Sequence, residues 1–305
     1  MPSVLNTNQA SLLAQKGLLG AQNSLANSVE RLSSGTRINR AKDDAAGLGV
    51  AENLQKQLNG AQQGLHNVND AISMAQVAEG ALQSVAAIAQ RMITLATQGA
   101  NDTMSQDQRK AIVTEIDHLR TSIQDIAKRT KYTDTLLFNY SKINSVNQGM
   151  YIQVSNRSSD RIFIGSEALG PISIDIATPT GTDAAPSSAT GQALNGAIKN
   201  LVDAGAAGTL TTDLFTAIQD KASDYLNAIT TQRGELGAVQ NQLEYTVSNL
   251  TEYSNNLSAS RSRVMDTDYA AETANLTKGQ ILQQASTAML AQANQMPNVI
   301  LTLLK

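Results

Sequence analysis

The sequence predicts a mainly α-helical protein, an elongated coiled-coil-like helical bundle with a small β-hairpin region in the middle. Two long segments repeat apolar residues at alternate steps of three and four, and one central segment alone is rich in β-branched residues. Aromatic residues make up only 3% of the chain. Small aliphatic side chains must therefore fill the core, which suits long helices that pack closely.

The first long helix is predicted to run from Leu54 to Ala96. A period of 3.5 residues sustained over such a length is typical of helices that wrap around one another. At a rise of ~1.5 Å per residue the segment would extend ~65 Å, too far for a compact globule. Only Glu79 interrupts the apolar stripe, whose positions are Leu54, Leu58, Ala61, Leu65, Val68, Ile72, Ala75, Glu79, Leu82, Ala86, Ala89, Ile93 and Ala96.

Two further helices carry the same spacing. A shorter stripe lies between Ile112 and Ile126, after Ser105 and Gln108, which are spaced as a capping box. A second long helix is predicted to begin at Thr212 or Asp213. Its stripe is Phe215, Ile218, Ala222, Tyr225, Ile229, Gln232, Leu236, Val239, Leu243, Thr246, Leu250, Tyr253 and Leu257.

The middle of the chain has a different character. Residues 150–155, 161–166 and 172–177 alternate partly and are enriched in β-branched side chains, so each is predicted to be a short strand. Residues 178–191 are rich in Ser, Thr, Ala, Gly and Pro without periodicity, and are predicted to be an exposed loop or linker.

Both ends of the chain are candidate amphipathic helices. Leucines recur every seven residues near the start, and Leu282, Met289, Met296 and Leu303 do so near the end. The simplest arrangement pairs the N-terminal helix with the C-terminal helix. Such stripes exceed what one chain can cover, and contacts that do not close generate helical filaments. The residues expected to drive self-assembly are Leu5, Leu12, Leu19, Leu25, Leu32, Leu282, Met289, Met296, Ile300 and Leu303.

No catalytic, cofactor or metal site is predicted. The chain has no cysteine, and its two histidines, His66 and His118, show no metal-ligand spacing. Asp43 and Asp44 are adjacent and would diverge by ~100° on a helix, so they are interpreted as a helix start or hinge. The net charge of -3 implies no basic face, so a nucleic-acid partner is not expected. No apolar stretch reaches the ~20 residues that membrane insertion needs, and no cleavable secretory signal is recognised at the start.

Several long motifs resemble the terminal regions of bacterial flagellin. They are LNTNQASLLAQKGL, LANSVERLSSGTRINRAKDDAAGLGVAENL, VNDAISMAQVAEGAL and the stretch from NLSASRSRVMDTDYAAE to the C-terminus. The resemblance covers roughly residues 1–130 and 195–305. It implies a secreted, non-enzymatic structural protein that polymerises into the extracellular flagellar filament for motility and is exported through the flagellar type III apparatus.

The resemblance also implies a layered organisation. Residues 1–42 and 261–305 would form the inner helical core, called D0. Residues 43–177 and the helix at 193–260 would form the surrounding D1 layer, with residues 178–192 as a reduced variable loop.

The implied partners are other copies of the chain, the hook–filament junction and filament-cap proteins, a flagellar export chaperone and Toll-like receptor 5. For the receptor, Arg91, Leu95 and Glu115 fall at the matching positions. Ile93 and Thr94 depart from the pattern there, replacing an Arg and a Glu.

Three alternatives remain open from the sequence. A hook–filament junction protein would share similar termini and length, although the segment SSGTRINRAKDDAAGL is more similar to flagellin. A coiled-coil scaffold unrelated to motility would explain the stripes but not the termini. An enzyme with a metalloprotease insert is disfavoured, because the insert is short and lacks histidine.

Overall fold

The structure, a computed structural model, describes residues 8–138, 149–165, 168 and 186–303. Side chains are described at these positions except for residues 149, 186–188 and 296–303. Helices dominate, and the strands of the described residues form two two-stranded sheets, so the predicted mainly α class is confirmed. The chain divides into two compact units, Met1–Leu58 with Asn255–Lys305, and Asn59–Ser254.

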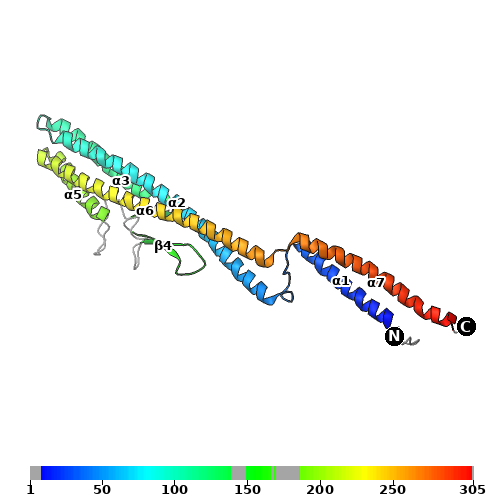
Figure 1. Ribbon diagram of the computed structural model, residues 1–305. Helices are drawn as coiled ribbons and strands as arrows, with labels where there is room; N and C mark the ends of the chain where they lie inside the picture. Colours follow the sequence, from blue (N-terminus) through cyan, green and yellow to red (C-terminus); the bar gives the residue numbers. More distant parts are fainter. Residues whose placement is uncertain (1–7, 139–148, 166–167, 169–185, 304–305) are drawn as a thin grey trace. The chain divides into compact units, whose positions relative to one another are not determined.

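In the first unit, α1 (Gln9–Ser34) and α7 (Tyr269–Leu303) lie side by side and antiparallel (Figure 1). Asn8 caps α1 by accepting the N–H of Ser11 at 3.1 Å, and its Nδ2 donates to the carbonyl of Ala293 at 2.8 Å. The start of α1 therefore lies beside the end of α7, which confirms the predicted pairing of the N-terminal and C-terminal helices.

Small and polar residues make up much of the seam between α1 and α7. On each helix the buried and half-buried residues follow a heptad series. A Cβ added at Gly279 would be 3.6 Å from Leu25, so the two backbones approach closely there. The series are Ser11, Ala14, Leu18, Ala21, Leu25, Ser28 and Leu32 on α1, and Glu272, Leu276, Gly279, Gln283, Ser286, Leu290 and Ala293 on α7.

Hydrogen bonds connect the segment that follows α1 with the segment that precedes α7. α1 ends at Gly35, whose φ of +71° is a left-handed conformation that glycine adopts without strain. The carbonyl of Gly35 accepts the N–H of Thr267 at 3.0 Å, and the guanidinium of Arg37 donates to the carbonyl of Val264 at 2.8 Å. The segment after α1 is thereby tied to the segment that precedes α7.

Asp43 and Asp44 form the start of α2 (Ala45–Gly99), as predicted. Asp44 Oδ1 accepts the N–H of Gly47 at 2.8 Å, which is a helix-capping bond. Asp43 Oδ2 accepts the N–H groups of Arg40 at 2.9 Å and Asn39 at 3.2 Å. The backbone N–H of Arg40, above all, holds the pKa of Asp43 below its ordinary value.

The second unit contains most of α2 with α3 (Gln106–Arg129), α5 (Pro186–Ala207) and most of α6 (Thr212–Met265). Every predicted stripe position of α2 is buried or half-buried. A second stripe, not predicted, is also buried because α2 packs against more than one helix of a bundle. It consists of Ala71, Met74, Ala78, Val85, Met92 and Leu95.

The predicted helix starts are confirmed. Ser105 caps α3, and both bonds of the capping box with Gln108 are present. α6 begins at Thr212. All predicted positions of α6 from Phe215 to Leu236 are at most 2% exposed, whereas Tyr253 is 42% exposed. Glu79 Oε2 accepts a hydrogen bond from Gln240 Nε2 of α6 at 3.2 Å, so the polar residue in the apolar stripe has a partner on the facing helix.

Two predictions about the middle of the chain are wrong. Part of the predicted loop, from Pro186 onward, belongs to α5, which packs Leu194, Ile198 and Leu201 into the core. The single helix predicted over 193–260 is also two helices, because Gly208, with a φ of +73°, ends the α5 segment before α6. Burial of three apolar side chains outweighs the weak helix preference of the residues around them.

The β structure is antiparallel. β1 (Lys131–Tyr132) pairs with β2 (Thr135–Leu136), and β3 (Gly149–Gln153) pairs with β4 (Arg161–Gly165). The strands predicted at 150–155 and 161–166 are confirmed, and the one predicted at 172–177 lies outside the described residues. Ile162 and Ile164 of β4 face the core, while Tyr151 and Phe163 form an exposed aromatic pair at 5.0 Å between ring centroids.

The turn after β3 rests on glycines of α2. A Cβ at Gly64 would collide with the carbonyl of Val154, and a Cβ at Gly60 would lie 2.8 Å from Asn156. Asn67 Nδ2 donates to the carbonyl of Gln153 at 2.8 Å. The hairpin therefore packs on a strip of α2 about two turns long, from Gly60 to Asn67, where the two glycines leave room for its turn.

Candidate functional site

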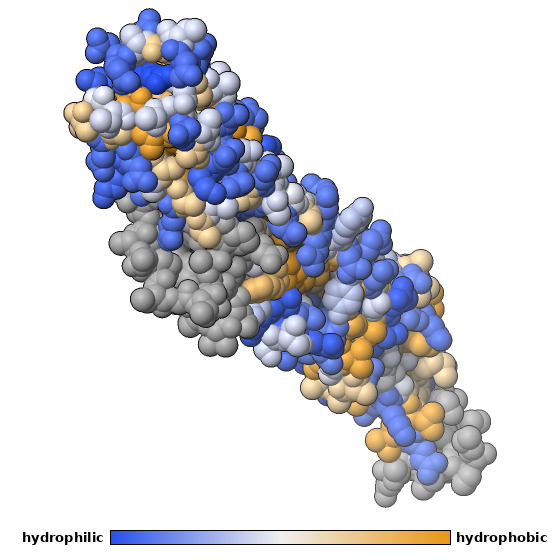
Figure 2. Space-filling model, turned by 90° about the vertical axis from the view of Figure 1, so that its left-hand side faces the viewer, coloured by the Kyte–Doolittle hydropathy of each residue, from blue (hydrophilic) through white to orange (hydrophobic). Residues whose placement is uncertain are grey.

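The α1·α7 pair exposes an unusual amount of apolar surface. Figure 2 shows hydrophobic surface, in orange, on this pair at the lower end of the view. Leu13 and Met289 are 76% and 65% exposed, respectively. Exposed apolar patches are typical of interaction sites on soluble proteins. The exposed large apolar residues are Leu12, Leu13, Leu19, Val29, Ile281, Leu282 and Met289.

This surface carries almost no charge. Between Gln9 and Val29 the single charged residue is Lys16, and between Thr273 and Gln295 it is Lys278. No acidic residue occurs in either segment. A partner for this surface must therefore be apolar and largely uncharged, since a charged group would be desolvated there without an opposite charge.

An apolar groove runs along one side of the pair. Its cavity volume is about 500 Å³. Most of the lining residues are small, and Leu13 and Met289 are its large apolar members. The lining residues are Gln9, Ala10, Leu13, Ala14, Gly17, Ala285, Ser286, Met289, Gln292 and Ala293.

The predicted self-assembly residues separate into three groups. Leu25 and Leu32 are half-buried in the α1·α7 seam. The other described members are exposed and are available to a neighbour: Leu12, Leu19, Leu282 and Met289. Leu5 lies outside the described residues, and the last helical turns, where only the backbone is described, hold Met296, Ile300 and Leu303.

The seam between the two helices contains only part of the predicted stripes. Leu25 and Leu32 of α1 lie in it, whereas Leu12, Leu19, Leu282 and Met289 do not, and half of the seam positions are Ser, Ala or Gly. The sequence-based prediction followed the largest side chains and missed Leu13 and Ile281, which add to the exposed surface. The signal that was available is the heptad series of small residues beginning at Ser11.

The three predicted receptor-binding residues have different environments. Arg91 of α2 and Glu115 of α3 form an ion pair at 2.7 Å, with side chains 52% and 44% exposed. Leu95 is only 2% exposed and belongs to the core cluster. The folded chain therefore does not offer the predicted contact by Leu95, whose side chain packs between helices.

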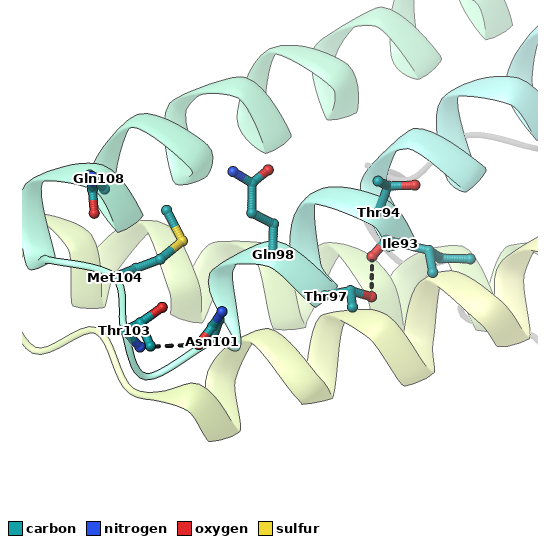
Figure 3. A pocket seen from close by; sticks show the side chains of 8 residues that line it. All are labelled: Ile93, Thr94, Thr97, Gln98, Asn101, Thr103, Met104 and Gln108. Atoms are coloured by element: carbon teal, nitrogen blue, oxygen red, sulfur yellow. Dashed lines mark hydrogen bonds between the residues drawn. The ribbon is translucent and has the colours of Figure 1, made fainter.

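A second, open cavity lies beside the loop between α2 and α3 (Figure 3). Some of its polar groups bond locally: Thr97 Oγ1 donates to the carbonyl of Ile93 at 2.9 Å, and Thr103 N–H donates to Asn101 Oδ1 at 3.1 Å. No charged residue lines it. This cavity provides neither a nucleophile nor an acid–base pair.

The described residues show no cluster of metal ligands and no membrane-spanning helix. Within the described ranges, no group of three or more His, Cys, Asp or Glu is placed to hold a metal ion. Burial raises the pKa of the Tyr225 phenol, which lies wholly inside the helical core. None of the described helices is both long enough and apolar enough to cross a membrane.

Comparison with known proteins gives consistent results. Residues 5–142 match the family described as the bacterial flagellin N-terminal helical region, and residues 219–304 match the C-terminal helical region. The chain is 36% identical to flagellin of Bacillus subtilis over 99% of both chains. It is 34% identical to polar flagellin F of Vibrio parahaemolyticus over 100% of both.

Among solved structures, the fold is similar to that of a protein assigned to the flagellar hook-associated class from Vibrio parahaemolyticus. The TM-score is 0.58 at 15% identity, covering 73% of this chain and 100% of the other. At that identity the likeness concerns the fold alone.

Proposed function

Because this chain belongs to the bacterial flagellin family, we propose that it is a structural subunit that polymerises into the bacterial flagellar filament and so serves motility. The observation that carries the proposal is the exposed apolar surface of the α1·α7 pair. Two helices alone bury little there, and their largest side chains, among them Leu13 and Met289, point into solvent. Neighbouring copies are the natural cover for such a surface.

The energetics favour assembly. Full burial of one Leu, Ile, Val or Met side chain is worth ~1.5–3 kcal/mol. Association has its own cost of ~4–15 kcal/mol in lost freedom of motion. The seven exposed apolar side chains of the pair, shared over several neighbours, can outweigh that cost only when many contacts form together. A polymer with repeated contacts meets this condition better than an isolated pair of chains.

The layers follow from the same proposal. Residues 1–42 and 261–305 would form the inner D0 core, and residues 43–177 with α5 and with α6 as far as residue 260 would form the D1 layer. The subunit would leave the cell through the flagellar type III apparatus with the help of an export chaperone. In the extracellular filament it would adjoin the hook–filament junction and cap proteins.

Recognition by Toll-like receptor 5 is the finer part of the proposal. Arg91 and Glu115 support it, because they are exposed, paired and close together on adjacent helices. The buried Leu95 contributes by holding α2 in place rather than by contact.

The hook–filament junction protein is the second candidate. The fold does not separate the two, because a protein of the hook-associated class shares it at a TM-score of 0.58. Sequence supports the flagellin candidate, because identity to a flagellin is 36% over nearly the full length of both chains. The flagellin assignment is therefore preferred over the junction protein, and over a scaffold or an enzyme.

Assembly of the purified chain tests the proposal. Seeded or salted protein is expected to form micrometre-long filaments in negative-stain electron microscopy. Short oligomers or caps would favour the junction protein or a scaffold instead. The same preparation is expected to show no hydrolytic activity, and a metal-dependent protease activity would reverse that conclusion.

A further inference from the structure

We propose that Met289 of α7 is a modification site, at which a peroxide oxidises the thioether in the free subunit, and that the sulfoxide formed there blocks polymerisation until it is reduced. Met289 is 65% exposed and lines the apolar groove of the α1·α7 pair. The inference rests on the proposed function and adds a chemical control of the surface that assembles.

Exposure distinguishes Met289 from the other methionines whose side chains the structure describes. The chain has eight methionines, and the side chains of all but Met1 and Met296 are described. Met74 and Met92 are 3% and 0% exposed and belong to the core of the second unit. Three more are half-buried: Met104, Met150 and Met265. Because a solvent-exposed thioether is oxidised before an enclosed one, Met289 is expected to react first among those described.

The reaction is an oxygen transfer that uses only the side chain and the peroxide. The sulfur of Met289 attacks one oxygen of hydrogen peroxide, the O–O bond breaks and an S–O bond forms. The sulfur loses two electrons, and the peroxide is reduced to water. The product, methionine sulfoxide, is polar, and a methionine sulfoxide reductase with a dithiol as the electron donor converts it back to the thioether.

The surroundings of Met289 make this change of polarity unfavourable for assembly. No charged residue lines the groove, and Leu13, its other large apolar member, is 76% exposed. In the proposed filament, neighbouring copies cover the apolar surface that includes both side chains. A thioether is suited to such a contact, whereas a sulfoxide oxygen loses its hydrogen bonds to water when it is covered. Oxidation therefore weakens the association of subunits without disturbing the buried core.

Assembly should in turn protect the site. A neighbour that covers Met289 also excludes the peroxide from its sulfur. The free subunit is then the sensitive form, and the finished filament is the resistant form.

Peroxide treatment of purified subunits tests the inference, with peptide mass spectrometry to follow each methionine. Once Met289 is oxidised, the critical concentration for polymerisation is expected to rise roughly tenfold or more, because a polar group is covered. Methionine sulfoxide reductase with a dithiol should restore the value of untreated protein. In finished filaments Met289 should be oxidised roughly tenfold more slowly than in free subunits, since a neighbour shields it.

Three variants identify the residue responsible. Met289→Leu keeps an apolar side chain of similar size, so it should polymerise both before and after peroxide treatment. Met289→Gln places a polar amide at the site and should polymerise poorly without any peroxide. Met104→Leu is the matched control, because Met104 is half-buried in the second unit, and this variant should remain as sensitive to peroxide as the wild type. If Met289→Leu itself fails to polymerise, reductase rescue of the wild-type chain still decides.

Peroxide-treated Met289→Leu that no longer polymerises would assign the sensitivity to another methionine and overturn the inference. Wild-type subunits that polymerise normally with Met289 oxidised would overturn it too, as would equal oxidation rates in subunits and filaments. In each of these cases the untreated chain still forms filaments, so the filament function stands. If the untreated wild-type chain forms no filaments, the proposed function fails and the inference with it.

Discussion

A Cβ atom added to Gly99, the last residue of α2, would lie 2.4 Å from the ring of Phe215 in the first turn of α6. The Phe215 ring is fully buried, so it has no free space into which to move. The absence of a side chain at residue 99 is therefore what allows the two helices to meet at this end of the second unit.

Gly99→Ala is accordingly expected to destabilise the chain by ~1–3 kcal/mol, the usual cost of overpacking a core. The midpoint of urea or thermal unfolding measures the change. Gly80→Ala is the control within the same helix, because nothing lies within 4 Å of a Cβ there. That variant should gain ~0.5–1 kcal/mol from helix preference alone. Equal effects of both substitutions on stability would show that the contact with Phe215 does not limit the size of residue 99.

Arg109→Ala is expected to destabilise the second unit by ~1.5–3 kcal/mol, the range for hydrogen bonds from charged groups. The Arg109 side chain is 7% exposed, and its guanidinium donates to the carbonyls of Asn101 at 3.0 Å and Leu210 at 3.2 Å. It thereby joins the α2–α3 loop to the α5–α6 loop. Lys cannot join both loops with one ammonium, so Arg109→Lys should not restore stability.

Arg129→Ala serves as the control for that experiment, since its side chain is 81% exposed and pairs with Asp125 on the same helix. A change of ~0.5 kcal/mol or less is expected. Chemical denaturation of all three variants decides between the outcomes. A similar loss for Arg109→Ala and Arg129→Ala would contradict the bridging role.

The turn before α2 is expected to loosen at low pH. Because the pKa of Asp43 is lowered in the folded chain, its ionised form stabilises the turn above the ordinary pKa of an aspartate, and this contribution is lost as the pH falls through the lowered pKa. The protection factor of the Arg40 amide, which donates to Asp43, should fall over that window, where the protection factor is the intrinsic exchange rate at each pH divided by the measured rate. In Asp43→Asn the protection factor should be low and independent of pH. An unchanged acid dependence in that variant would assign the effect to another group.

Removal of residues 286–305 is expected to abolish polymerisation while leaving a folded helical monomer. The truncation removes Met289 and the α7 side of the groove, and also Ala293, whose carbonyl holds Asn8. The second unit is untouched, so its cooperative unfolding should persist by circular dichroism. Normal filaments from the truncated chain in negative-stain images would show that this end of α7 is dispensable.

Charge exchange separates receptor binding from stability at Arg91 and Glu115. Arg91→Glu places two carboxylates together, and the double exchange with Glu115→Arg restores an ion pair of opposite direction. Because the pair is about half exposed, stability should change by no more than ~1 kcal/mol in either variant. Affinity for the Toll-like receptor 5 ectodomain is expected to fall at least tenfold in both. Full affinity in the double variant would show that the pair matters only for folding.

The long helices were predictable because their heptads are strong and their caps are specific. Ser105 with Gln108, and the stripe that begins at Phe215, appear in the structure as the spacing predicts. The start of α5 at Pro186 and its separation from α6 were missed, because Leu194, Ile198 and Leu201 stand among small residues that resemble a linker. Tertiary packing, which no local pattern records, makes that segment a helix.

The candidate site was predictable in location but not in detail. Sequence spacing identified both ends of the chain and their pairing. It could not tell which stripe faces the partner helix, because Ser11, Ala21 and Ser28 are weaker signals than the leucines beside them. Nor could it show that Leu95 is buried, since α2 presents two apolar stripes to a bundle rather than one to a single partner.

The strip of α2 beneath the hairpin has a consequence for how the chain can vary. Gly64 makes room for the carbonyl of Val154, and Asn67 donates to the carbonyl of Gln153, so these contacts are to main-chain atoms of the hairpin. Main-chain atoms are the same whichever side chains accompany them. The hairpin turn can therefore exchange its sequence without losing these attachments, whereas the two helix positions beneath it cannot. The constraint on sequence at this contact therefore lies on the helix side.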